Sequence, residues 1–146
     1  PWWDPYARGT LVGVTRGTTK AHLTRAVVEA MALQTRDVVD AMVATSGHEV
    51  TGLKADGGAS AMDLLMQLQA DQLQVPVRRP EVQETTALGA AYLAGLAEGV
   101  WGSTDEITEN WVLDAEFQPE ADRSAVDAHH DRWRQAVEHS KGWAAR

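Results

Sequence analysis

Residues 50–73 read VTGLKADGGASAMDLLMQLQADQL, and this stretch decides the fold. The run 50–55 has the length of a short β-strand, although Gly52 and Lys54 weaken its pattern. Asp56-Gly57-Gly58 follows, and the leucines beyond it recur at helical spacing, counted from Ala61. The stretch therefore predicts a strand, a glycine turn and a helix that begins at once.

Upstream of this stretch, the sequence predicts another strand and a long helix. The β-prone run 10–15 lies between two glycines and is typical of a strand. Thr18 or Thr19 offers an N-cap for a helix that ends at Gly47. Apolar residues recur along this helix at amphipathic spacing: Leu23, Ala26, Val27, Ala30, Met31, Val38, Ala41 and Met42. Asp37 lies off that stripe beside Arg36, where structural pairing is its expected role.

Downstream, a third strand and a helix of small residues are expected. The strand spans 75–77, and Pro76 indicates a position at or near a sheet edge. The helix spans about 85–98 and stops at Gly99. Two glycines inside a helix cost ~1 kcal/mol each relative to alanine, so we expect a neighbouring backbone to approach closely.

The alternation of strands and helices ends after Trp101. Residues 103–106 resemble the start of a capped short helix, 111–117 are expected to be extended, and Pro119 opens a charged helix through about Trp143. The alternation of strands and helices over residues 10–99 predicts an α/β layer with a parallel sheet. We therefore divide the chain into an α/β part, 1–100, and a helical C-terminal extension, 101–146, that packs on the same domain.

Composition excludes several classes of function. The 146 residues carry a net charge of −8 without any Lys/Arg run, which argues against nucleic-acid binding. The chain has no cysteine, so disulfides and thiolate metal sites are excluded, and no apolar run approaches the ~20 residues of a membrane span. His129, His130 and His139 on the last helix do not form a convincing set of metal ligands. We expect no metal site and a cytoplasmic protein.

The turn at Asp56-Gly57-Gly58 is the chemically suggestive feature. A glycine pair lets the backbone approach a ligand where a Cβ would collide, and a helix N-terminus attracts anions such as phosphate. Met62 flanks the buried stripe of the following helix and could touch a ligand. Glycine turns of this kind also arise for packing alone, and this one matches neither G-x-G-x-x-G nor a P-loop. From spacing alone, both interpretations stay open.

A longer sequence pattern resembles the signature of a known protein family. Gly9-x-Leu11-x-Gly13-Val14, followed by His22-Leu23-x-x-Ala26-Val27-Val28-Glu29, resembles the second signature of the FGGY carbohydrate kinases. Further segments resemble the glycerol kinases of that family: 3–9 (WDPYARG), 34–37 (QTRD), 56–58 (DGG) and 84–95 (ETTALGAAYLAG). The resemblance runs from Trp2 to about Trp143.

The resemblance implies a fold and a ligand. The fold would be the latter part of an actin-like, ribonuclease-H-like ATPase domain, with 10–15 as the third strand of its core and two upstream strands missing. The cofactor would be ATP or ADP with Mg²⁺, the metal being held mainly through phosphates and residues outside this chain. The nucleotide site would include Gly57 and Gly58, with Met62 at a position where the family has an asparagine that contacts the adenosine. Met62 offers no amide, so its contact would be apolar.

The resemblance also implies an incapacity. In the family, the catalytic base and the glycerol-holding residues precede this region, so we expect no catalytic residue in this chain and no activity without an N-terminal portion. The predicted function is the C-terminal nucleotide-binding segment of an ATP-dependent glycerol kinase, which contacts glycerol and assembles as a homo-oligomer only at full length. The alternatives are a segment of another FGGY sugar kinase and a stand-alone adenine-nucleotide-binding module.

Overall fold

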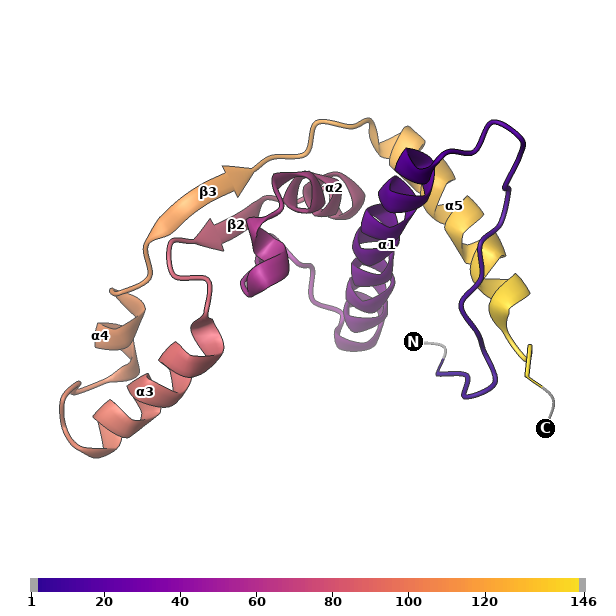
Figure 1. Cartoon of the computed structure of the whole chain (residues 1–146). Coiled ribbons are helices and arrows are strands. Elements are labelled where there is room, and N and C mark those ends of the chain that lie inside the picture. The colour runs from indigo at the N-terminus through magenta and orange to yellow at the C-terminus, as the bar shows by residue number, and fades with distance from the viewer. Residues whose placement is uncertain (1–2, 145–146) are drawn as a thin grey trace.

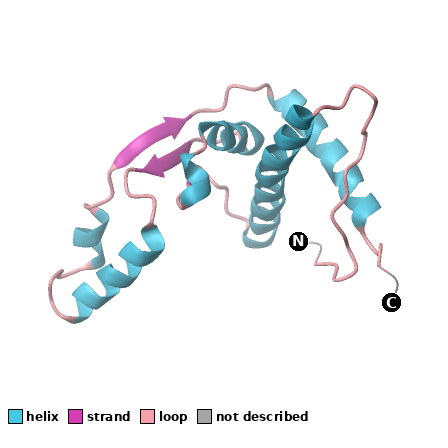
Figure 2. Ribbon diagram, viewed as in Figure 1, coloured by secondary structure: helices cyan, strands magenta, loops and turns pink. Residues whose placement is uncertain are grey.

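The computed structural model describes residues 3–144 and has two lobes joined by a ribbon of β-strands (Figure 1). The helices are α1 (Lys20–Ser46), α2 (Asp63–Leu73), α3 (Thr85–Ala97), α4 (Thr104–Thr108) and α5 (Arg123–Ser140), with a 3₁₀ turn η1 (Gly58–Ala61) before α2. The strands are β1 (Leu53–Lys54), β2 (Val77–Pro80) and β3 (Leu113–Phe117). Figure 2 shows the strands between helices α3 and α4 on one side and α1, α2 and α5 on the other.

The sheet has the order β1-β2-β3, with β1 parallel and β3 antiparallel to β2. The α/β class is confirmed, but the sheet is mixed and not parallel as predicted. Its antiparallel strand comes from 111–117, so residues 101–146 contribute to the sheet as well as supplying helices. β2 is central, and the edge position predicted from Pro76 is wrong. Pro76 precedes the strand and contributes its carbonyl oxygen, which accepts a hydrogen bond from the Leu53 N–H at 2.9 Å. Pro80 ends β2 at an irregularity in the register between Arg79 and Pro80.

Helix α1 has the bounds that its caps predict. Thr19 precedes the first turn, and Gly47 ends the helix in the left-handed conformation (φ 70°), donating its N–H to the Val43 carbonyl at 2.9 Å. A left-handed residue at this position satisfies an end carbonyl at no steric cost when it is glycine. Helix α4 is also capped as expected, since the Ser103 side chain accepts a hydrogen bond from the Glu106 N–H.

The core is small and lies where α1, α2 and the sheet meet. Its buried residues are Val28, Ala32, Leu65, Met66, Ala70 and Val77. Of the stripe predicted for this helix, Leu65 is buried and Leu68 half-buried in α2, whereas Leu64 of α2 and Ala61 of η1 are exposed. Because η1 separates the glycine pair from α2, Ala61 precedes the helix, and the buried face of α2 begins at Leu65.

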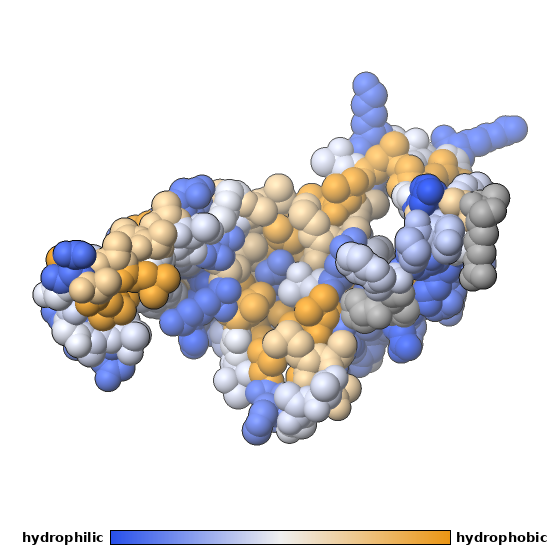
Figure 3. Space-filling model, turned by 90° about the horizontal axis from the view of Figure 1, so that it is seen from below, coloured by the Kyte–Doolittle hydropathy of each residue, from blue (hydrophilic) through white to orange (hydrophobic). Residues whose placement is uncertain are grey.

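The apolar stripe of α1 faces outward. Val27, Val38 and Met42 are 59%, 47% and 58% exposed, and Leu23 and Met31 are also exposed. The buried face of α1 consists of Val28, Ala32, Leu33, Arg36 and Asp37. Among the described elements, α2 and α5 pack on that second face, so the more apolar face remains uncovered. Figure 3 shows apolar surface gathered on the underside of the molecule, between the lobes.

The strand predicted at 10–15 is absent. Leu11, Val12 and Val14 are 64%, 57% and 60% exposed, in a loop that joins no described strand. A β-prone run becomes a strand when a neighbouring strand pairs with its backbone groups. Within residues 3–144 no strand pairs with the outer edge of β1 either. The structure thus exposes both a strand-forming segment and a sheet edge.

Helices α3 and α4 form the smaller lobe (residues 85–108), which lies apart from α1, α2 and α5 (Figure 1). Gly95 in α3 is where a close approach occurs, because a Cβ built there would lie 2.1 Å from the Trp101 ring. The neighbour is a side chain and not the backbone that the sequence led us to expect. Gly89 has no atom within 4 Å of the corresponding point, so close packing explains one of the two helical glycines.

The surface area measures how open this arrangement is. The folded chain exposes 10055 Å². A compact monomer of its 15.9 kDa mass exposes about 7,400 Å². The exposed area is therefore more than a third larger than that of a self-contained domain.

Candidate functional site

The turn of residues 57–62, which we call the glycine turn, follows the carboxyl end of β1. The Ala55 N–H donates to the Arg78 carbonyl at 2.9 Å, which keeps the chain paired with β2 up to the turn. The Gly57 N–H then donates to the Gln83 carbonyl at 2.8 Å. Ser60, which is 1% exposed, closes the turn by donating its N–H and its hydroxyl to the Gly57 carbonyl, at 2.9 and 2.7 Å.

The two glycines of the turn are needed for different reasons. Gly57 has φ 79° and ψ 170°, a region of backbone space that residues with a Cβ rarely enter. Gly58 has no such strain, and a Cβ at either position would meet no atom within 4 Å. The space beside Gly58 is therefore open, and nothing in the described residues fills it. A backbone that is bare and accessible in this way can be approached closely by a ligand.

The helix does not begin at the glycine pair. Residues 58–61 form η1, and Met62 is the N-cap of α2, with its carbonyl accepting hydrogen bonds from the Leu65 and Met66 N–H groups. Asp63 then places a carboxylate in the first turn of α2. That carboxylate already complements the helix dipole, so the N-terminus of α2 is less attractive to a phosphate than the sequence suggested. Met62, the last residue of the turn, is 41% exposed; it precedes α2, so it does not flank a buried stripe within that helix.

Arg79 on β2 contacts the glycine turn, although no sequence motif points to it. Its Nη1 donates to the Ser60 carbonyl at 2.9 Å and to Asp63 at 2.8 Å, and its Nε donates to Asp114 at 2.6 Å. Hydrogen bonds to Asp63 and then to Asp114 raise the pKa of Arg79 above its ordinary value. The sequence does contain an indication of this contact. Alternation along a strand places Arg79 on the same face as the buried Val77, and an arginine on a buried face needs hydrogen-bond partners.

A second polar cluster joins α1 to α5. Asp37 Oδ1 lies 2.7 Å from His130 Nε2, and its Oδ2 accepts a hydrogen bond from the Trp133 indole N–H at 2.6 Å. Arg36 donates to Gln72 and to the Val126 carbonyl, both buried. Structural pairing is therefore the role of Asp37, although its partners lie on α5 and not next to it in the chain. No group of three or more potential metal ligands occurs among residues 3–144.

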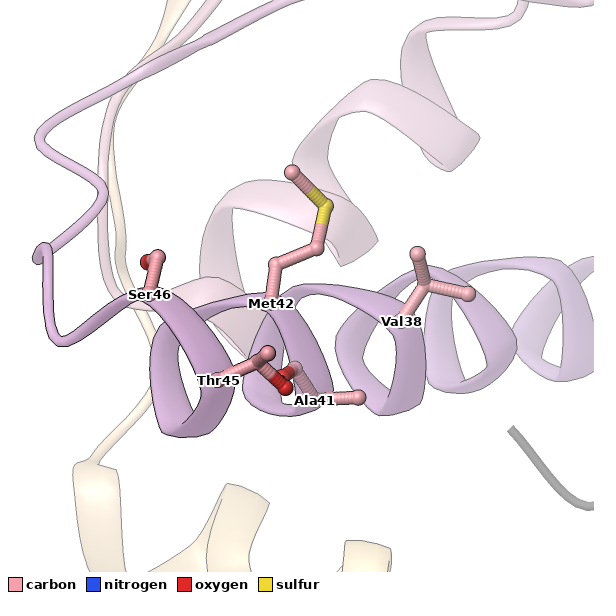
Figure 4. Close-up of a pocket in the computed structure, with 5 residues that line it drawn as sticks. All are labelled: Val38, Ala41, Met42, Thr45 and Ser46. Atoms are coloured by element: carbon pink, nitrogen blue, oxygen red, sulfur yellow. The ribbon is translucent and has the colours of Figure 1, made fainter.

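The surface also has two apolar hollows. One lies on the C-terminal half of α1 and is lined by Val38, Ala41, Met42, Thr45 and Ser46 (Figure 4); Val38 and Met42 are both exposed there. The other lies between the end of β2 and the smaller lobe, where Lys54 Nζ is 4.3 Å from the centre of the Trp111 ring. Neither hollow includes Gly57, Gly58 or Met62 in its lining.

Comparison with known proteins defines the class. Residues 1–98 match the model of the C-terminal domain of the FGGY family of carbohydrate kinases. The match covers more than half of the chain, and the chain belongs to this family. None of the described helices is long and apolar enough to cross a membrane.

Within the family, the chain is similar to glycerol kinases. It is 58% identical over 144 residues to the glycerol kinase of Oleidesulfovibrio alaskensis and 56% identical to that of Halobacterium salinarum, covering 99% of this chain in both cases. The chain spans 29% and 28% of the length of those relatives.

Solved structures share the fold. A glycerol kinase from Plasmodium falciparum, crystallised with ADP, aligns over 94% of this chain and 28% of its own length, with a TM-score of 0.82 and 31% identity. A xylulose kinase from Brucella ovis aligns over 95% of this chain and 29% of its own, with a TM-score of 0.79 and 31% identity. These neighbours are sugar and glycerol kinases, and one of their structures contains ADP.

Proposed function

We propose that this chain is the nucleotide-contacting C-terminal segment of an ATP-dependent glycerol kinase, which converts ATP and glycerol to ADP and sn-glycerol 3-phosphate. One observation carries the proposal: an open glycine turn at the carboxyl end of β1, in a chain that is 58% identical to a glycerol kinase over 99% of its length. Ligands of open α/β sheets bind beyond the carboxyl ends of the strands.

The residues of the glycine turn fit a nucleotide. Gly58 would present its bare backbone to the ligand, because the space where a Cβ would stand is empty. Met62 would contact the base through its polarisable thioether, without a specific hydrogen bond. Gly57 would hold the turn open through its positive φ. Mg²⁺, held by the phosphates and by residues outside this chain, would neutralise the charge of the transferred group.

Calorimetric titration of the chain with ADP tests the site, and Gly58→Val is the informative variant. Because Gly58 has ordinary φ and open space around it, valine there is expected to leave the fold intact while blocking the ligand. Gly9→Val is the matched control, since Gly9 is also exposed, unstrained and without close neighbours. We expect ADP binding by the wild-type chain and by Gly9→Val, and none by Gly58→Val. Equal binding by all three chains would remove the glycine turn from the site.

Catalysis would require a partner, namely the part of a glycerol kinase that precedes the matched span. The exposed surface exceeds that of a compact monomer by roughly 2,700 Å², which is the size of an obligate interface. The apolar stripe of α1 and the outer edge of β1 are exposed parts of that surface. We propose that the preceding portion covers them.

Complementation tests this partnership. The residues of the O. alaskensis enzyme that precede its match to this chain would be co-expressed with the chain, and glycerol-dependent ATP turnover would be measured. We expect no turnover by the chain alone and turnover by the pair. Val38→Asp and Met42→Asp, in the stripe, should abolish complementation, whereas Ala44→Asp, exposed on the same helix but off the stripe, should preserve it. Turnover by the pure chain would refute the dependence on a partner.

Similarity to xylulose kinases, with a TM-score of 0.79 against 0.82 for the glycerol kinase, supports a second candidate within the family. The same complementation separates the two, because a segment of another sugar kinase would restore activity with the corresponding portion of that kinase. A stand-alone nucleotide-binding module would bind ADP tightly and complement neither enzyme.

A further inference from the structure

We propose that Arg79 is a positioning residue for the nucleotide: it fixes the glycine turn to the sheet without touching the ligand. This proposal rests on the function proposed above. It concerns a residue that belongs to no motif of the sequence analysis and lies on a different strand from the glycine pair.

The side chain of Arg79 extends from β2 to the glycine turn. It is 12% exposed and lies over the Phe117 ring, with Cζ 5.5 Å from the ring centre. Its Nη1 bridges the Ser60 carbonyl of η1 and the carboxylate of Asp63, the first residue of α2. Its Nε is anchored on Asp114 of β3. A single guanidinium therefore connects two strands, the turn and the helix.

The other hydrogen bonds of the turn do not supply this connection. Ser60 bonds to Gly57 within the turn, which sets the turn's shape and leaves its orientation free. The Gly57 N–H bonds to the carbonyl of Gln83, which lies beyond the end of β2. Arg79 ties a carbonyl of η1 directly to the sheet. Loss of that tie would let residues 58–62 move relative to β1.

Charge excludes the simpler role of phosphate binding. Asp63 and Asp114 both lie within 2.8 Å of guanidinium nitrogens, so two carboxylates face one cation. An incoming phosphate would meet net negative charge and would have to displace one of these partners. The donors of Arg79 are directed at protein atoms, so the residue acts through the turn and not on the ligand.

Three variants of the complete chain test the proposal. Arg79→Met keeps much of the apolar stem and removes the donors, and Arg79→Lys keeps the charge but loses the fork that bonds two acceptors at once. Arg78→Met is the matched control: it removes the ion pair of the preceding residue with Glu116, on the opposite face of the same strand. Hydrogen exchange of the Ser60 and Met62 amides reports on the turn, and titration with ADP reports on the site.

We expect Arg79→Met to accelerate exchange at these two amides and to weaken ADP binding about tenfold, the size of one or two lost hydrogen bonds. In both exchange rate and ADP affinity, Arg79→Lys should lie between Arg79→Met and the wild type. Arg78→Met should match the wild type in both measurements. Unchanged exchange in Arg79→Met would overturn the positioning role whether or not ADP binds. Faster exchange with unchanged ADP affinity would overturn it too. Failure of the wild-type chain to bind ADP would instead overturn the function proposed above, and the role with it.

Discussion

Replacement of Asp37 by alanine should destabilise the larger lobe, which consists of α1, α2 and α5, more than the substitution of any surface residue. The Asp37 side chain is 3% exposed, and its two oxygens bind His130 and Trp133 of α5. Its removal leaves the buried His130 nitrogen and the partly buried indole N–H without acceptors, at ~1–3 kcal/mol each. Discounting the more accessible Trp133, we expect the free energy of unfolding to fall by about 3 kcal/mol, which corresponds to a loss of roughly 10 °C in Tm.

Urea unfolding, followed in parallel by far-UV circular dichroism and by tryptophan fluorescence, measures the effect. Asp37→Asn should lose less, about 1–2 kcal/mol, because the amide oxygen still accepts one hydrogen bond. The control is Asp40→Ala on the same helix: Asp40 is 57% exposed and 3.6 Å from Arg36, so its removal should cost at most ~0.5 kcal/mol. A stability of Asp37→Ala within ~1 kcal/mol of the wild type would refute the inference that this carboxylate holds α5 on α1.

Three further outcomes are expected. Gly95→Ala should destabilise the smaller lobe, because its Cβ would overlap the Trp101 ring, and a fluorescence shift of Trp101 would report the displacement. Gly89→Ala, in the same helix with open space, should stabilise it by up to ~1 kcal/mol, and a loss of thermal stability there would contradict this account. The hydrogen bond from Arg36 lowers the pKa of Asp127 below its ordinary value of 3.8. Its contribution to stability is therefore present above pH 3.8 and lost as the pH falls through the lower folded value, so Asp127→Asn should flatten the acid side of the stability profile measured by urea titration.

Local signals in the sequence predicted local structure well. The bounds of α1, the Ser103 cap of α4 and the end of α3 at Gly99 all depend on hydrogen bonds within a few residues. These features need no partner from a distant part of the chain, so residue type and spacing suffice.

Features that depend on distant partners were predicted poorly. The run 10–15 has strand-forming residues, but none of the described strands lies beside it. Pro76 was assigned to an edge because the sequence does not show that 111–117 would pair on the far side of β2. The apolar stripe of α1 identified an amphipathic helix but not which face the remaining chain would cover.

The residues of the candidate site also differ in how far the sequence predicts them. Gly57 and Gly58 can be found from the sequence, because bare backbone at the end of a strand is a local pattern. Arg79 supports the turn from another strand, and its partners lie 16, 19 and 35 positions away in the chain. Its role emerges when the strand alternation is combined with the observed contacts. The placement of a nucleotide on the turn stays a prediction.

The ribbon of β2 and β3 has a mechanical consequence. Both strands run into the smaller lobe, which shares no apolar core with α1, α2 and α5 among the described residues. The ladder is irregular at Arg79/Pro80, close to the point where the ribbon meets that lobe. Bulges bend and twist strands locally. A change in bend or twist at this point would therefore reorient the smaller lobe relative to α1, α2 and α5 without breaking a contact of the apolar core.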